Sequence, residues 1–106
     1  MEFIKNAESI YDYRLKNNMD VYGFEDTGLT ENGKREASKI KGDFDIVVLS
    51  PARCCQETLK HSKLKTQVVI TTPIVDKDIV TLKDYLKKYH GSRICVIFHN
   101  YFFSGK

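Results

Sequence analysis

The hydrophobic positions along this chain form short runs that predict the strands of a buried sheet. Residues 46–49 and 94–98 are apolar without alternation, which is typical of strands covered on both faces of a parallel sheet. Residues 67–72 are rich in β-branched residues and are followed by Pro73. Proline has no backbone N–H to donate to a neighbouring strand, so the strand is expected to end there. The strands expected from these patterns are residues 2–6, 45–50, 67–72 and 93–98.

Capping residues and helical spacing predict helices between these strands. Thr30 is a suitable N-cap and Gly42 a suitable stop, so the first expected helix covers residues 31–41. Pro51 is tolerated in a first helical turn, which starts a second helix that runs to about residue 62.

The clearest amphipathic pattern comes later in the chain. It begins after Asp76 or Asp78, either of which can cap it, and ends before Gly91. By contrast, residues 10–26 are polar and turn-prone. They predict a loop with one helical turn near residues 9–16.

This order of elements predicts one α/β domain over residues 1–106. We expect a three-layer α/β/α architecture with a mostly parallel four-stranded sheet. Binding sites in such sheets form at the carboxyl ends of the strands. Asn6, Ser50 and His99 all follow strands, so we expect them to meet in one cleft.

Composition narrows the function classes. No apolar run approaches the roughly 20 residues that span a bilayer, and the first residues do not resemble a secretory signal. We therefore expect a cytoplasmic protein without a membrane partner. The net charge of +3 comes from scattered lysines rather than a block, so nucleic acid is not an expected partner either.

The cysteines suggest structural roles. Cys54 and Cys55 are adjacent and Cys95 lies in a strand, a spacing that fits neither a disulfide framework nor a zinc site. No arginine or glycine-rich loop follows the pair, as a cysteine phosphatase would need. We expect at most one exposed thiol in the pair, Cys95 as a small apolar residue, and neither metal nor cofactor.

Three motifs together resemble the histidine phosphatase superfamily, whose fold is phosphoglycerate mutase-like. Residues 29–37 fit L-T-x-x-G-x-x-x-A, a strand ends in Ser50-Pro51, and the next helix carries Glu57-Thr58. The resemblance extends from about residue 2 to residue 100. It implies a scaffold in which a histidine is phosphorylated and arginines hold the phosphate.

The residues that carry the family's chemistry are largely replaced in this chain. Where the family has Arg-His-Gly after the first strand, the chain has Lys5, Asn6 and alanine, and the second arginine position holds Cys54. Arg53 stands one residue early, which turns its side chain by about 100° on a helix. His99 is the only central residue retained.

These replacements lead to two expectations of function. The first is a catalytically degenerate, phosphatase-like binding or interaction module whose cleft binds a phosphate or phosphorylated ligand through Lys5, Arg53 and His99. The alternative is a weak or altered phosphatase that uses His99 on a phosphate ester or phosphoprotein. In either case Asp76 or Asp78 is a candidate acid near the cleft.

The end of the chain suggests a third possibility. The resembled family usually continues beyond this point into a further helix and strand, which would leave a sheet edge exposed here. We expect that edge, together with an aromatic tail, to be able to support a homo-oligomer or contact a protein partner. The aromatic tail residues are Tyr101, Phe102 and Phe103.

Overall fold

A computed structural model describes residues 1–99 of the chain. They form a four-stranded sheet in the order β1-β4-β2-β3, and every pair of neighbouring strands is parallel. The α/β class is confirmed, and the sheet is wholly rather than mostly parallel. The strands are β1 (Glu2–Lys5), β2 (Lys41–Leu49), β3 (Lys63–Thr71) and β4 (Ile94–Phe98). The helices are α1 (Ile10–Lys16), α2 (Glu31–Ser38), α3 (Arg53–His61), η1 (Pro73–Asp76), α4 (Ile79–Leu86) and η2 (Lys87–Tyr89).

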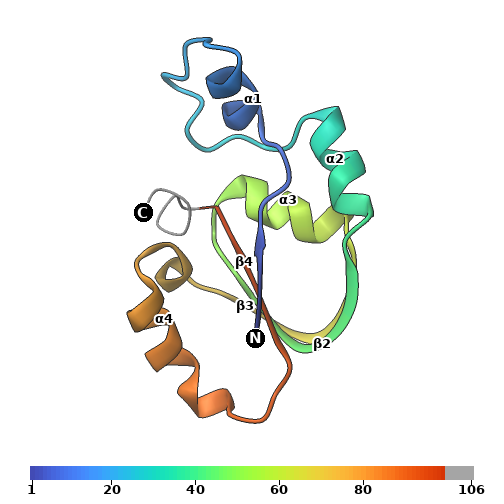
Figure 1. The fold of residues 1–106 in the computed structure, drawn as a ribbon, viewed down its shortest axis with the longest axis vertical. Helices are drawn as coiled ribbons and strands as arrows, with labels where there is room; N and C mark the ends of the chain where they lie inside the picture. Colours follow the sequence, from blue (N-terminus) through green and yellow to red (C-terminus); the bar gives the residue numbers. More distant parts are fainter. Residues whose placement is uncertain (100–106) are drawn as a thin grey trace.

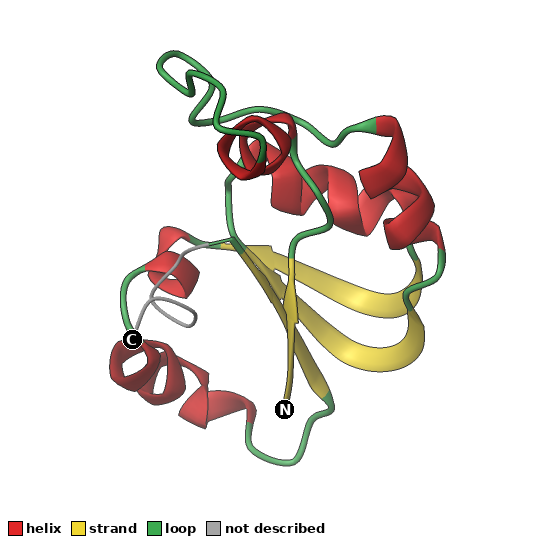
Figure 2. Ribbon diagram, turned by 45° about the horizontal axis from the view of Figure 1, so that its top comes forward, coloured by secondary structure: helices red, strands yellow, loops and turns green. Residues whose placement is uncertain are grey.

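Helices cover both faces of the sheet (Figure 2). On one face, Ala37 of α2 and the cysteines of α3 pack against Val47 and Ile97 of the strands. The other face is covered by η1 and α4. Val47 and Ile97 are fully buried, as the unbroken apolar runs predict for strands covered on both sides. The residues under α4 and η1 are Ile46, Val48, Val75, Leu82, Leu86, Ile94, Val96 and Phe98.

A local irregularity in β2 places Phe44 and Ile46, which are two residues apart, on opposite faces of the sheet. The backbone N–H groups of Asp45 and Ile46 both donate to the carbonyl of Arg93, at 2.9 and 3.2 Å. Two residues therefore oppose one, as in a β-bulge. As a result Phe44 packs under α2 and α3 while Ile46 packs under α4.

The strands β2 and β3 begin earlier than their apolar runs predict. The pairing of the two strands starts at Lys41 with Lys63, whereas β4 joins β2 only at Ile46 (Figure 1). The added length is a two-stranded ribbon held by backbone hydrogen bonds, so its side chains can be polar. Gly42, the expected helix stop, lies in this ribbon, and α2 ends at Ser38.

Two further boundaries also differ from the prediction. Pro51 lies outside α3, because the Ala52 N–H donates to Ser50 Oγ at 3.1 Å in a turn that precedes the helix. The last predicted helix is α4 followed by the short helix η2. Asp78 caps α4 by accepting from the Thr81 N–H at 2.7 Å, while Asp76 ends η1.

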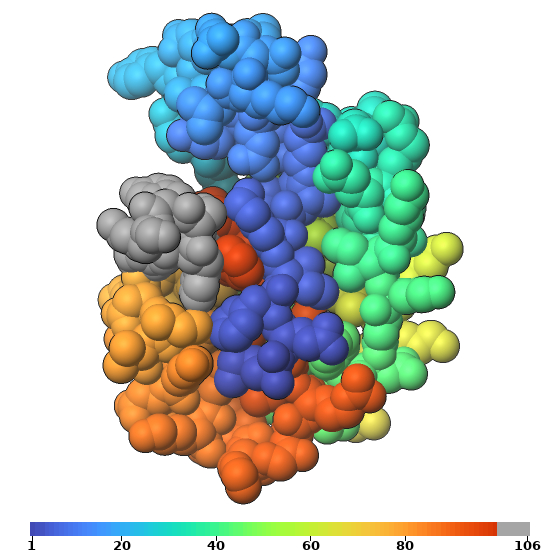
Figure 3. All heavy atoms as spheres, viewed as in Figure 1, coloured from blue at the N-terminus to red at the C-terminus, as the bar shows by residue number. Residues whose placement is uncertain are grey.

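Residues 10–16 form a helix where a loop with one turn was expected. Ser9 accepts a hydrogen bond from the Asp12 N–H and Asp12 accepts one from the Ser9 N–H, both at 3.0 Å. This reciprocal capping starts α1 although the helix buries none of its residues. In the space-filling view, α1 and the loop after it form the upper end of the molecule (Figure 3).

Gly33 holds the loop that follows β1 against the start of α2. A Cβ atom at this position would lie 2.0 Å from the carbonyl oxygen of Glu8, so a glycine is needed for the approach. The same carbonyl accepts a hydrogen bond from the Thr30 N–H at 3.1 Å. Thr30 also caps the helix by accepting from the Gly33 N–H at 2.9 Å.

Glu57 and Thr58 of α3 hold two other loops. Thr58 Oγ1 accepts from the Ala7 N–H at 3.0 Å and donates to the Cys54 carbonyl at 2.7 Å. Glu57 accepts from the Leu29 N–H at 2.9 Å, a bond that lowers the pKa of its carboxyl group. We call Gly33, Glu57 and Thr58 the joint residues, since each fixes the backbone of another segment.

Two other expectations concern the surroundings of the domain. Within residues 1–99, no helix has the length and apolar character needed to cross a membrane. The aromatic tail of Tyr101, Phe102 and Phe103 lies outside the described residues, so its role in a homo-oligomer or partner contact stays a prediction.

Candidate functional site

The carboxyl ends of β1, β2 and β4 bring Asn6, Ser50 and His99 into one region. The sheet ladder continues past the strands: the Asn6 N–H donates to the Phe98 carbonyl at 2.9 Å. The Ser50 N–H donates to the Ile97 carbonyl at 3.1 Å. The three residues therefore lie together at this end of the sheet, but only Asn6 and His99 line the cavity described next, because Ser50 is fully buried.

A cavity of about 200 Å³ opens at this end of the sheet, and we call it the cleft. It combines residues from strand ends, from α1 and its following loop, and from the first turn of α3. A larger hollow of about 350 Å³ lies at the opposite end of the strands and contains none of the strand-end residues. The cleft is lined by Asn6, Ser9, Tyr11, Asp12, Glu25, Cys54 and His99.

Two hydrogen bonds donated by the Asn6 side-chain amide fix its position in the cleft. Its Nδ2 donates to the Ala7 carbonyl at 2.6 Å and to Asp12 Oδ2 at 3.1 Å. Asn6 is buried, and Asp12 is already committed to capping α1. Because an amide has no basic nitrogen, Asn6 can bind and orient a ligand but cannot attack phosphorus.

The His99 ring contacts the carboxylate of Asp76. Its Nδ1 lies 3.1 Å from Asp76 Oδ2, a contact better described as an ion pair than as an aligned hydrogen bond. Asp76 raises the pKa of His99, first through this direct contact with Nδ1 and then through its negative charge, against the effect of burial. Of the two candidate acids, Asp76 therefore contacts a lining residue of the cleft without lining it, while Asp78 is exposed at the start of α4.

The Asp76 carboxylate is itself stabilised as an anion. Burial alone would raise its pKa, but the contacts with His99 and a hydrogen bond from Ser50 Oγ outweigh burial and lower the pKa. Ser50 is fully buried. The arrangement thus favours a charged carboxylate beside a protonated imidazole.

Cys54 and His99 both line the cleft, whereas Cys55 is fully buried and is not part of the lining. The Cys55 thiol, by hydrogen bonding, and the His99 charge both lower the pKa of Cys54, against the effect of burial. The same hydrogen bond and burial raise the pKa of Cys55, which stays a thiol. All three cysteines are buried and free of disulfide bonds. The prediction that at most one thiol of Cys54 and Cys55 is exposed is therefore confirmed.

Lys5 and Arg53 do not line the cleft. Lys5 is in register with Phe98, whose side chain packs under α4, so Lys5 lies on the sheet face that α4 covers and is absent from the lining. Arg53 is exposed and pairs with Glu57 at 3.2 Å. Anion binding by these residues stays a prediction, and of the expected set only His99 contributes to the lining.

Four lining residues were absent from the sequence-based candidates: Ser9, Tyr11, Asp12 and Glu25. Asp12 had a readable signal, because Ser9-x-x-Asp12 is a capping pattern that starts a helix beside Asn6. Tyr11 follows from the same helix. Glu25 had no such signal, since it reaches the cleft through the fold of an irregular loop.

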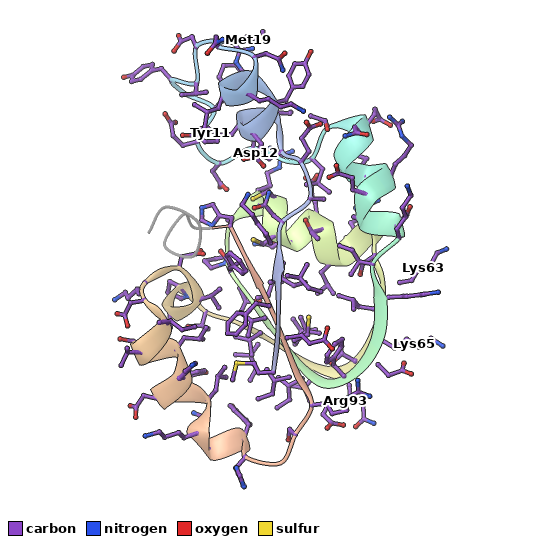
Figure 4. All side chains as sticks on the ribbon, viewed as in Figure 1. Tyr11, Asp12, Met19, Lys63, Lys65 and Arg93 are labelled. Carbon is purple, nitrogen blue, oxygen red and sulfur yellow. The ribbon has the colours of Figure 1, made fainter. Side chains whose placement is uncertain are left out.

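The charged side chains that line the cleft are mainly acidic. Figure 4 shows Asp12 and Tyr11 at the lower end of α1, whereas the cationic Lys63, Lys65 and Arg93 lie toward the other end of the sheet. Among residues 1–99, His99 is the only lining residue that can carry a positive charge. Among residues 1–99, no three His, Cys, Asp or Glu side chains are grouped as a metal site requires.

Comparison with known proteins adds no relative. The chain matches no protein-family model, no curated protein and no solved structure.

Proposed function

We propose that this chain is a degenerate histidine-phosphatase-like protein that binds a small ligand in the cleft without transferring phosphate. The observation that carries the proposal is the Asn6 amide, which occupies the strand end where the resemblance implies the nucleophilic histidine. An amide is uncharged, and the hydrogen bonds to Ala7 and Asp12 fix its position. Such a group supports binding rather than covalent chemistry.

The lining favours a positively charged ligand over a phosphate. Asp12 and Glu25 supply negative charge, and Tyr11 offers an aromatic face on which a cation can rest. A phosphate would meet one cation, His99, whose charge is already compensated by Asp76. We therefore infer a small ammonium-type ligand that fits within about 200 Å³.

Hydrolysis of p-nitrophenyl phosphate tests the loss of phosphatase activity. The purified chain should release no more nitrophenol than its His99→Ala variant, because residue 6 is an asparagine that cannot attack phosphorus and no arginine or lysine among the described residues lines the cleft to hold a phosphate. Release by the unchanged chain that disappears in His99→Ala would overturn the proposal. His90→Ala is the matched control, since His90 is exposed and lies outside the cleft.

The alternative phosphatase is favoured by one observation, the contact between His99 and Asp76. A carboxylate at Nδ1 leaves Nε2 as the nitrogen that could attack phosphorus. In that case a phosphohistidine should be trapped at His99 after rapid mixing with the same ester. Absence of the acid-labile adduct, with unchanged intact mass, would exclude this alternative.

A further inference from the structure

The cleft contains a thiol and an imidazole from different segments of the chain. Cys54 comes from the first turn of α3 and His99 follows β4, and both line the same cavity. The other two cysteines differ in position, since Cys55 and Cys95 are fully buried in the core under α2 and α3. Only Cys54 therefore combines a cavity with a neighbouring histidine.

The histidine is oriented by a third group. Asp76 holds Nδ1 at 3.1 Å, and Asp76 in turn accepts a hydrogen bond from the buried Ser50 hydroxyl. A carboxylate in this position fixes the ring and favours its protonated form, leaving Nε2 for a partner in the cleft. Nucleophile, base and orienting carboxylate are the three parts of an activated nucleophile.

The surroundings of the sulfur favour a thiolate. Cys54 lies near the amino end of α3, where the helix dipole stabilises an anion. Cys55 donates a hydrogen bond and His99 supplies positive charge, and both lower the pKa of Cys54. Burial, Asp12 and Asp26 act in the opposite direction without reversing the shift.

We propose that Cys54 and His99 form a thiolate–imidazolium pair that reacts with small uncharged electrophiles entering the cleft. The sulfur lone pair forms a bond to an electrophilic carbon, and the leaving group departs with the electrons of the bond that breaks. Where the leaving group is basic, the His99 imidazolium gives it a proton. The acidic residues Asp12 and Glu25 disfavour anionic reagents. This proposal does not rest on the proposed ligand or on the loss of phosphatase activity.

The rate of alkylation by iodoacetamide, followed by mass spectrometry from about pH 5 to about pH 10, tests the pair. The rate for Cys54 should rise with an inflection below the ordinary cysteine value of about 8.5. Cys55 and Cys95 should stay unmodified in the folded chain, and Cys54→Ser should abolish the early reaction. An inflection at or above that value, or a Cys54 that is not alkylated at any pH, would overturn the proposal.

Two comparisons separate the role of His99 from simple exposure of the thiol. His99→Gln should move the inflection upward, while His90→Gln, at an exposed position outside the cleft, should leave it unchanged; both variants are checked for folding by circular dichroism. Iodoacetate should react more slowly relative to iodoacetamide than it does with the denatured chain. An inflection that His99→Gln does not move would contradict the pairing, whatever the result of the phosphatase assay.

Discussion

The joint residues and the cleft residues make different kinds of contact. Gly33 and Thr58 contact the backbone of another segment, at Glu8 and Ala7. In the cleft, by contrast, His99 and Asn6 each contact the side chain of an acidic residue, although Asn6 also donates to the Ala7 carbonyl. Backbone contacts need a particular residue type whatever reaction the protein performs.

This difference predicts that the two groups of residues respond differently to substitution. The joints determine where the loops after β1 and before α2 lie, so they are tied to folding stability. Cleft residues such as Asn6 and Cys54 can change as long as each new side chain finds a partner. We expect substitutions at the joints to change stability and substitutions in the cleft to change binding and reactivity.

The largest expected effect is that of Gly33→Ala. The new Cβ would lie 2.0 Å from the Glu8 carbonyl oxygen, a backbone atom that cannot move aside without shifting the loop. We expect a loss of about 2 kcal/mol in the free energy of unfolding, even though alanine favours helices. Urea denaturation followed by circular dichroism measures it.

Asn32→Ala is the control for this substitution, because Asn32 is the exposed neighbour of Gly33 on α2. Its change should stay within about 0.5 kcal/mol. Equal stability of Gly33→Ala and the unchanged chain would mean that the loop after β1 is not held by this approach.

A smaller effect is expected from Thr58→Val. Valine keeps the shape of the fully buried threonine but leaves the Ala7 N–H without its acceptor. The expected loss is about 1–2 kcal/mol in the free energy of unfolding, measured in the same way. Thr71→Val is the control at an exposed strand end, and a loss of the same size there would remove the special role of Thr58.

The smallest effect concerns the pH dependence of the His99–Asp76 contact. The raised pKa of His99 means that its contribution to stability is complete below about pH 6.5 and is lost as the pH rises through the folded value. The lowered pKa of Asp76 means that its contribution is present above about pH 3.9 and is lost as the pH falls through the folded value. The contact is thus strongest between these limits.

Asp76→Asn should lower the pKa of the His99 ring, read from its NMR signals, and reduce stability mainly within that window. The rings of His61 and His90 serve as internal controls, since neither contacts Asp76 in the structure. An unchanged His99 titration in Asp76→Asn would show that the carboxylate does not hold the ring.

Much of the fold could be predicted because apolar runs mark the buried strands and capping residues mark the starts of helices. The unbroken runs at 46–49 and 94–98 identified the core strands. Thr30 identified one helix start, and Asp78 was one of two candidate caps for another. The ribbon that begins at Lys41 and Lys63 could not be found in this way, because backbone pairing rather than side-chain burial holds it.

The site was predicted only in part for a similar reason. Strand ends identified Asn6 and His99, and Asp76 was one of two candidate acids. Arg53 illustrates the limit, since its neighbour Glu57 is available as a partner and the sequence did not reveal which way the side chain turns. Glu25 reaches the cleft through an irregular loop that no period or cap describes.

The most direct test of the account is an NMR titration of the folded chain with tetramethylammonium and, separately, with inorganic phosphate. The account predicts that tetramethylammonium shifts the His99 ring signals saturably at millimolar concentration, while phosphate does not and the signals of His61 and His90 respond to neither. A saturable shift of His99 with phosphate, and none with tetramethylammonium, would contradict it and show that the cleft still binds the anion of a phosphatase.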